Sequence, residues 1–89
     1  MKAIFELKER LDKENIDHEF IDRTSPYTDE FYQIVLKDEN NYISVIQGYG
    51  SYGNEKNLLE LYDPCNCDEP EGYLTVEEAL NIIKNTLEL

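Results

Sequence analysis

The sequence is poor in the residues that catalytic and metal sites use most often. Its only histidine is His18, and its two cysteines stand together as Cys65-Asn66-Cys67. A structural zinc site needs four Cys or His ligands, so two copies would have to share their thiolates, and two loop cysteines without a special role are the simpler interpretation. No motif ties a nucleophile to His18, and no pair of acids stands out for acid–base chemistry. We therefore predict no catalytic residue, no metal site and no cofactor.

Motifs for phosphate, calcium and nucleic acid are also missing. No Gly-Lys-Ser/Thr follows the glycines of residues 48–53, so a phosphate-binding loop is not supported. The acids between Asp63 and Glu71 do not have the spacing of a calcium-binding EF-hand loop. The basic, aromatic-rich patch that is typical of a nucleic-acid-binding protein is absent as well. We therefore expect no direct binding of nucleic acid.

Long apolar runs are absent too. No run approaches the roughly 20 apolar residues that a membrane-spanning helix needs. Residues 1–10 mix charges of both signs and contain no apolar signal-peptide core. These absences predict a cytoplasmic protein that has no membrane partner and whose cysteines are reduced.

Basic residues are scarce. Lys and Arg number 8 against 20 Asp and Glu, so the formal net charge is −12 at pH 7. Such a surface repels nucleic acid and anionic membranes and attracts basic proteins. The same charge also keeps a small protein soluble, and solubility alone is the simpler explanation. If a basic partner exists, we expect it to meet Asp68, Glu69 and Glu71, in the acidic segment that follows Tyr62.

One amphipathic helix is predicted near the beginning of the chain. Over residues 2–14, the side chains of Ile4, Leu7 and Leu11 fall on one apolar stripe, while charged residues face away from it. Asn15 is a suitable end for this helix, because asparagine tolerates the left-handed conformation that follows a last helical turn.

A second amphipathic helix is predicted at the end of the chain. Thr75 can cap its first turn while Glu78 reaches back to the backbone, which is the capping-box arrangement. The apolar stripe of this helix consists of Val76, Ala79, Leu80, Ile83 and Leu87.

Four segments between the helices are typical of β-strands. The composition and the alternation of apolar and polar residues predict strands at 16–22, 31–37, 42–47 and 58–62. A short helix is the alternative for the last of these, but the run before it is strongly β and the glycine-rich reversal is short. Residues 38–41 predict a hairpin turn, and residues 63–72 predict an acidic loop.

These elements predict an α+β fold in the order α-β-β-β-β-α. The short connections require a four-stranded antiparallel meander. The N- and C-terminal helices then most simply pack on one face of the sheet, which gives a two-layer sandwich formed by a single domain over residues 1–89.

The other face of the sheet is expected to be apolar, whereas a solvated face would alternate to polar residues. Either loops and the twist of the sheet cover this face, or it meets another chain, as a homodimer or with a bound partner. The residues expected on it are Phe31, Val35, Tyr42, Ile46, Leu58 and Tyr62.

The glycine-rich segment between the third and fourth predicted strands carries Tyr49, Ser51 and Tyr52. Tyrosine together with serine and glycine is typical of binding loops, because rigid aromatic rings stand there on an adaptable backbone. Tyrosines that pack back onto the sheet are the alternative, and the simpler one.

Four stretches of the chain resemble a known group of sequences. They are Ser44-Val-Ile-Gln, Gly50-Ser-Tyr-Gly, Leu58-Leu-Glu-Leu and Gly72-Tyr-Leu-Thr-Val-Glu-Glu, and the similarity spans roughly residues 42–84, about half of the chain. In order and spacing they resemble small uncharacterised proteins encoded in phages and prophages of Gram-positive bacteria. No activity is assigned to that family, so the resemblance implies a mobile genetic element and a host cytoplasm, and it implies no catalytic residues.

The sequence thus predicts a small, non-enzymatic accessory protein that acts by binding a protein of the host or the phage. In a sharper form of this hypothesis, its charge imitates nucleic-acid phosphates and occupies a basic host protein. A structural homodimer is one alternative, and a small-ligand binder or enzyme that uses tyrosines, His18 and carboxylates is another. The candidate partner-binding residues are Tyr42, Ile46, Tyr49, Ser51, Tyr52, Tyr62, Asp68, Glu69 and Glu71.

Overall fold

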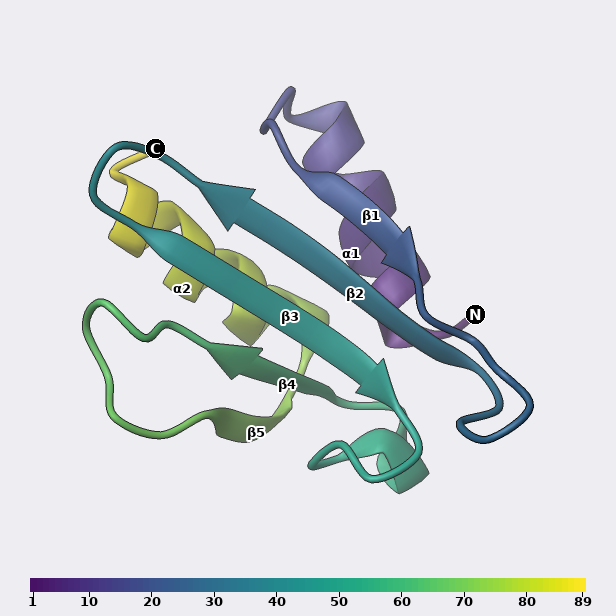
Figure 1. The fold of residues 1–89 in the computed structure, drawn as a ribbon. Coiled ribbons are helices and arrows are strands. Elements are labelled where there is room, and N and C mark those ends of the chain that lie inside the picture. The colour runs from purple at the N-terminus through teal and green to yellow at the C-terminus, as the bar shows by residue number, and fades with distance from the viewer.

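Two helices cover one face of a five-stranded antiparallel sheet (Figure 1). The structure is a computed structural model that describes residues 1–89. The elements are α1 (Ala3–Lys13), β1 (Glu19–Asp22), β2 (Phe31–Lys37), β3 (Tyr42–Gly48), the 3₁₀ helix η1 (Asn54–Lys56), β4 (Leu59–Tyr62), β5 (Glu71–Leu74) and α2 (Val76–Leu87). The order of the strands in the sheet follows the sequence, so the sheet is a meander whose edges are β1 and β5.

α1 forms where the sequence predicts the first helix, within a residue at each end. Its apolar stripe, which includes Ile4, Leu7 and Leu11, is buried against the sheet. The helix stops at the predicted place, because Asn15 adopts a left-handed φ of 56°.

α2 has the predicted capping box. Glu78 donates its backbone N–H to Oγ1 of Thr75 at 3.1 Å, and Thr75 donates its backbone N–H to Oε1 of Glu78 at 3.0 Å. The hydrogen bond from the backbone of Thr75 holds the pKa of Glu78 below its usual value. The buried residues of the helix are Val76, Ala79, Leu80 and Ile83.

β2 and β3 form the central hairpin, as the sequence predicts. Their register runs one to one from the pair Phe31–Gly48 to the pair Lys37–Tyr42. Asp38 closes the turn, because one of its carboxylate oxygens accepts two backbone N–H groups of the turn at 2.9 and 2.8 Å. These hydrogen bonds hold the pKa of Asp38 below its usual value.

The prediction of four strands is wrong, because β5 adds a fifth. The sequence predicts a loop over 63–72, but Glu71 and Gly72 belong to β5, which pairs antiparallel with β4. The register of this pair shifts within the strand, so β5 contains a bulge, and Tyr73 in the bulge has a left-handed φ of 58°. A bulge breaks the alternation of side chains by which a strand is found in a sequence.

Smaller corrections concern the ends of elements. β1 begins at Glu19, so the strand predicted over 16–22 is shorter than expected. The glycine-rich segment is not only a tight reversal, since it also contains η1. The preference for a strand over a helix at 58–62 is confirmed, with β4 beginning one residue later, at Leu59.

The hydrophobic core lies between the sheet and the helices, with α1 over β2 and β3 and α2 over β4 and β5. A cluster of aromatic rings closes the core beside β1. Phe5 lies 4.8 Å from Tyr32 and 5.9 Å from Phe20, measured between ring centroids. Neither helix has the length and apolar character that a crossing of the bilayer requires.

Candidate functional site

No helix packs on the face of the sheet that points away from α1 and α2, and we call this the open face (Figure 1). Side chains alternate between the two faces along a strand, so the pairing registers show which open-face residues are neighbours. The open face consists of a row formed by Ile21, Gln33, Ile46 and Glu60, a row formed by Glu19, Val35, Ser44 and Tyr62, and the flanking pairs Phe31–Gly48 and Lys37–Tyr42.

The open face is mixed in polarity. Val35 is 7% exposed and Ile46 is half-buried, so neighbouring side chains already cover much of both. Polar groups lie between them, because Nε2 of Gln33 donates to Oγ of Ser44 at 2.7 Å. Nε of Arg23 donates in turn to Oε1 of Gln33 at 2.6 Å. Five of the side chains expected to make this face apolar lie on it, with this line of hydrogen bonds among them, and they are Phe31, Val35, Tyr42, Ile46 and Tyr62. The placement of Leu58 on this face is wrong, because Leu58 precedes β4 and lines a hollow with residues of α1 and α2.

Tyr42 and Tyr62 supply the most exposed aromatic surface of the open face. Tyr42 is 39% exposed and Tyr62 is 37% exposed. Tyr62 lies opposite Ser44, which puts Tyr42 on the diagonal position of the neighbouring strand, within reach of a long aromatic side chain. Each ring is therefore supported by the sheet on one side and is accessible to a partner on the other.

Aromatic residues cover two glycines of the sheet. A Cβ on Gly48 would overlap the ring of Phe31 and lie 2.9 Å from its Cα. A Cβ on Gly72 would overlap Cβ of Tyr52. Because these positions carry no side chain, Phe31 and Tyr52 can lie directly against the backbone.

The glycine-rich segment is fixed to the sheet by its backbone. Ser51 is buried, and its Oγ accepts the N–H of Gly48 at 3.0 Å and donates to the carbonyl oxygen of Gly48 at 2.8 Å. The N–H of Tyr52 donates to Oε1 of Glu60 at 2.8 Å. Ser51 therefore shapes the turn from within and does not present its hydroxyl to a partner, whereas Tyr49 is 80% exposed.

Tyr73 is an exposed aromatic residue that sequence reasoning missed. It is about half exposed, and its N–H donates to the carbonyl oxygen of Tyr52 at 3.2 Å. A left-handed φ is uncommon for a bulky residue, and close packing holds it here, since a Cβ on Gly53 would lie 3.0 Å from Cα of Tyr73. The available signal was the glycine beside it, Gly72, which often marks a bulge in a strand.

The acidic segment between β4 and β5 is anchored at one end by a buried acid. Asp63 is buried, and both of its carboxylate oxygens accept hydrogen bonds from Nδ2 of Asn66. Asp68 and Glu69 are exposed in the loop, and the exposed Glu71 begins β5. Two of the three acids predicted to meet a basic partner thus lie in the loop before β5, and the third begins this edge strand. Cys65 and Cys67 are exposed, free thiols in the same loop.

His18 joins the end of α1 to the beginning of β1. Its ring is largely buried, with Nδ1 2.8 Å from the carbonyl oxygen of Ile16 and Nε2 3.4 Å from Oδ1 of Asp12. Both ring nitrogens thus have partners within the chain, in keeping with a structural role. No three His, Cys, Asp or Glu residues come together in a group that could hold a metal ion.

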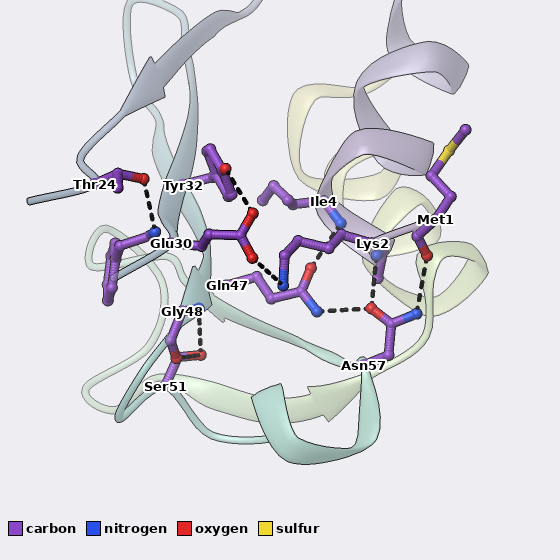
Figure 2. A network of polar contacts seen from close by, with 12 residues as sticks. Met1, Lys2, Ile4, Thr24, Glu30, Tyr32, Gln47, Gly48, Ser51 and Asn57 are labelled. Carbon is purple, nitrogen blue, oxygen red and sulfur yellow. Dashed lines mark hydrogen bonds and ion pairs between the residues drawn. The ribbon is translucent and has the colours of Figure 1, made fainter. Parts of the chain in front are cut away.

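The first turn of α1 is capped by side chains from elsewhere in the fold (Figure 2). Oε1 of Gln47 accepts the N–H of Ile4 at 2.9 Å, and Oδ1 of Asn57 accepts the N–H of Ala3 at 2.8 Å. Such N–H groups have no partner inside the helix and can bind an anion when they are free. Here they are bonded to side-chain amide oxygens, so this end of α1 connects the helix to the rest of the fold.

A second set of polar contacts lies beside this cap (Figure 2). The carboxylate of Glu30 lies 3.5 Å from Nζ of Lys2, and it accepts the hydroxyl of Tyr32 at 3.3 Å. Burial is the main cause that raises the pKa of Tyr32 above its usual value. These groups tie the loop before β2 to the start of α1.

No protein-family model, curated protein or solved structure matches this chain. The open face, with its tyrosines and acidic edge, is the candidate site on the strength of its own geometry.

Proposed function

We propose that the protein is a small binding module that recognises a basic protein through the open face. The observation that carries this proposal is the pair Tyr42–Tyr62, two partly exposed rings on a sheet face without a helix, in a chain of net charge −12. Tyrosine rings suit such a role, because they offer apolar area, a hydrogen-bonding hydroxyl and a face that attracts Lys and Arg side chains.

The distribution of the cations supports a basic partner. Four of the 8 basic residues are already in ion pairs with acids of the same chain, and these four are Lys2, Lys8, Arg10 and Lys84. All four belong to the helix layer or lie just before it. The field around the molecule is therefore set by unpaired acids, which would steer a basic protein toward it and make the association rate fall with added salt.

The same charge argues against a second copy as the occupant of the open face. Two copies would bring net charges of −12 and −12 into contact, and like charges at an interface oppose association. The line of hydrogen bonds through Gln33 also makes the face more polar than the interface of a typical obligate dimer.

We further propose the accessory role that the resemblance to phage and prophage proteins implies. The chain would act in the host cytoplasm and would occupy the surface with which a basic host protein holds nucleic acid. Nucleic acid carries closely spaced phosphates that such a protein binds through Lys and Arg, and an acidic chain competes for the same groups.

The test begins with affinity capture from a Gram-positive host lysate at low salt, followed by purification of the captured protein. That protein is then titrated with the wild-type chain, with the double variant Tyr42→Ser/Tyr62→Ser, and with Tyr27→Ser as the matched control. Tyr27 is 95% exposed and lies outside the sheet. We expect the double variant to bind at least roughly tenfold more weakly, as loss of two aromatic contacts implies, and the control to bind normally.

Two results would overturn the proposal. One is equal affinity of the double variant and the control. The other is light scattering that shows a stable particle of twice the 10.5 kDa chain mass without any partner, since this would make a second copy the occupant. Competition by nucleic acid for the captured protein tests the mimicry, and its absence would remove that part of the proposal alone.

A further inference from the structure

β1 is a regular edge strand. Its pairing with β2 runs without a bulge from Glu19–Val35 to Asp22–Tyr32. The next pair continues the pattern, because Arg23 donates its backbone N–H to the carbonyl oxygen of Phe31 at 2.8 Å. Hydrogen-bonded and non-hydrogen-bonded pairs alternate along an antiparallel ladder.

This alternation assigns the direction of each backbone group of β1. Arg23 is hydrogen-bonded to β2, so Ile21 and Glu19 are bonded to β2 as well. The N–H and C=O groups of the residues between them, Phe20 and Asp22, point away from the sheet. No hydrogen bond outside the sheet ladder uses these four backbone groups. They form a regular row of donors and acceptors without an intramolecular partner.

The opposite edge of the sheet does not offer such a row. β5 is bulged at Tyr73, whose N–H is already taken by the carbonyl oxygen of Tyr52. A bulge and an occupied donor both interrupt pairing with another strand. Of the two edges, β1 is therefore the one that can accept a further strand.

We propose that an extended, lysine- or arginine-bearing segment of the partner adds to β1 as a sixth strand. This inference rests on the proposed function, because it names the way in which a basic protein binds. β1 carries the exposed acids Glu19 and Asp22, which lie next to any strand that pairs with it. A second copy of β1 is disfavoured at this position, because it would bring another chain of net charge −12 against this edge.

The side chains of β1 define the pattern that such a segment should have. Ile21 continues the open-face row toward Gln33 and Ile46, so an added strand would widen the open face. On the other side of the strand, Phe20 belongs to the aromatic cluster and lies 5.9 Å from Tyr32. Glu19 and Asp22 lie on opposite sides of β1. An alternation of basic and apolar residues would therefore place its cations beside Asp22 and its apolar groups beside Ile21, or its cations beside Glu19 and its apolar groups beside Phe20.

The experiment uses a labelled synthetic peptide of about eight residues, in which lysine alternates with valine, a length that suits pairing with one strand. Asp22→Pro removes the outward N–H, and Asp22→Ala removes the same carboxylate but keeps the N–H. Proline is tolerated where an edge N–H faces solvent, so the fold should survive. One exposed ion pair contributes little binding free energy, so we expect Asp22→Ala to bind the peptide roughly two- to fivefold more weakly than the wild type. We expect Asp22→Pro to lose roughly another tenfold, as loss of a backbone hydrogen bond and the bulk of the ring imply.

A second arm leaves the protein unchanged. Peptides are N-methylated either on the residues whose N–H groups would face β1 or on the residues between them. We expect the first kind of methylation to abolish binding and the second to have little effect. Peptide binding should also shift the NMR amide signals of Phe20 and Asp22 more than those of β5.

Equal binding by Asp22→Pro and Asp22→Ala, or equal effects of the two methylation patterns, would overturn the addition of a strand. In that case, weaker binding of the captured protein by the Tyr42→Ser/Tyr62→Ser variant would still uphold the proposed function, so the two failures are distinguishable. A peptide that alternates glutamate with valine serves as the charge control. Binding of that peptide at equal strength would remove the preference for a basic segment.

Discussion

The side-chain amide of Gln47 donates to Oδ1 of Asn57 across 2.8 Å, and together the two residues cap the first helix. Gln47 is 1% exposed and lies on the helix side of β3, in line with Ile43 and Val45. A polar residue at that depth is stable only when its amide is satisfied, and here both ends of the amide have partners.

Gln47→Leu should therefore destabilise the protein although leucine suits a core position. The change leaves the N–H of Ile4 buried without an acceptor, which costs about 1–3 kcal/mol of unfolding free energy. Urea unfolding followed by circular dichroism measures the loss. Asn57→Gly is the companion variant, because glycine keeps the left-handed backbone at φ 56° and removes only the amide. The double variant should lose less unfolding free energy than the two single variants lose in sum. Strictly additive losses would show that the two residues do not act together.

Gly48→Ala should be destabilising for steric reasons. The new methyl group would meet the ring and the Cα of Phe31, and overpacking of this kind costs about 1–3 kcal/mol. Gly50→Ala is the matched control, because nothing lies within 4 Å of its added methyl group and only its φ of +88° opposes the change. Its expected cost is about 1 kcal/mol. Thermal unfolding compares the stabilities of the two variants. A larger loss of stability in Gly50→Ala than in Gly48→Ala would show that Phe31 does not oppose a side chain at position 48.

Thr75→Ala should lower the free energy of unfolding by about 1 kcal/mol, because it removes the cap of α2.

Glu78→Gln tests the other half of the capping box through the pH dependence of stability. The folded protein lowers the pKa of Glu78 relative to the ordinary value of 4.5. Its contribution is therefore complete above that value and is lost as the pH falls through the lowered pKa. The stability gap between wild type and Glu78→Gln should thus shrink on going from about pH 7 to about pH 3. A gap that stays constant would show that the charge of Glu78 has no part in the cap.

Tyr49→Ser should leave unfolding free energy within about 0.5 kcal/mol of the wild type, since the side chain is 80% exposed. The binding-loop interpretation of the sequence implies the same for Tyr52, but the structure leads us to expect a measurable loss of stability there. Tyr52 packs its Cβ and Cγ against Gly72, and serine would remove the ring from this contact. Chemical denaturation of the two single variants separates the cases, and equal stability would place Tyr52 among the free contact residues.

The parts of the fold that could be predicted are those governed by local chemistry. The capping box at Thr75 and the left-handed stop at Asn15 depend on residues close in sequence, and both are confirmed. The strand β5 pairs with β4 across a bulge at Tyr73, and the N–H of Tyr73 bonds to Tyr52, which precedes both η1 and β4 in the chain. No local pattern encodes that contact.

The candidate site shows the same division. Alternation along the strands correctly puts Tyr42 and Tyr62 on the side of the sheet away from the helices. It could not show that Ser51 is buried, because the hydroxyl closes a turn whose shape depends on the left-handed φ of Gly50. Nor could it assign which backbone groups of β1 point outward, since their direction depends on the register of the whole pair.

The dependence of the α1 cap on Gln47 and Asn57 has a consequence for the order of events during synthesis. α1 leaves the ribosome before the sheet, but a helix of 11 residues is marginal in isolation. Two of its first N–H groups must wait for acceptors that lie 43 and 54 residues further along the chain. The meander needs no such delay, because each new strand pairs with the one made just before it. α1 is thus made before the sheet but is expected to become ordered after β3 and Asn57 are in place.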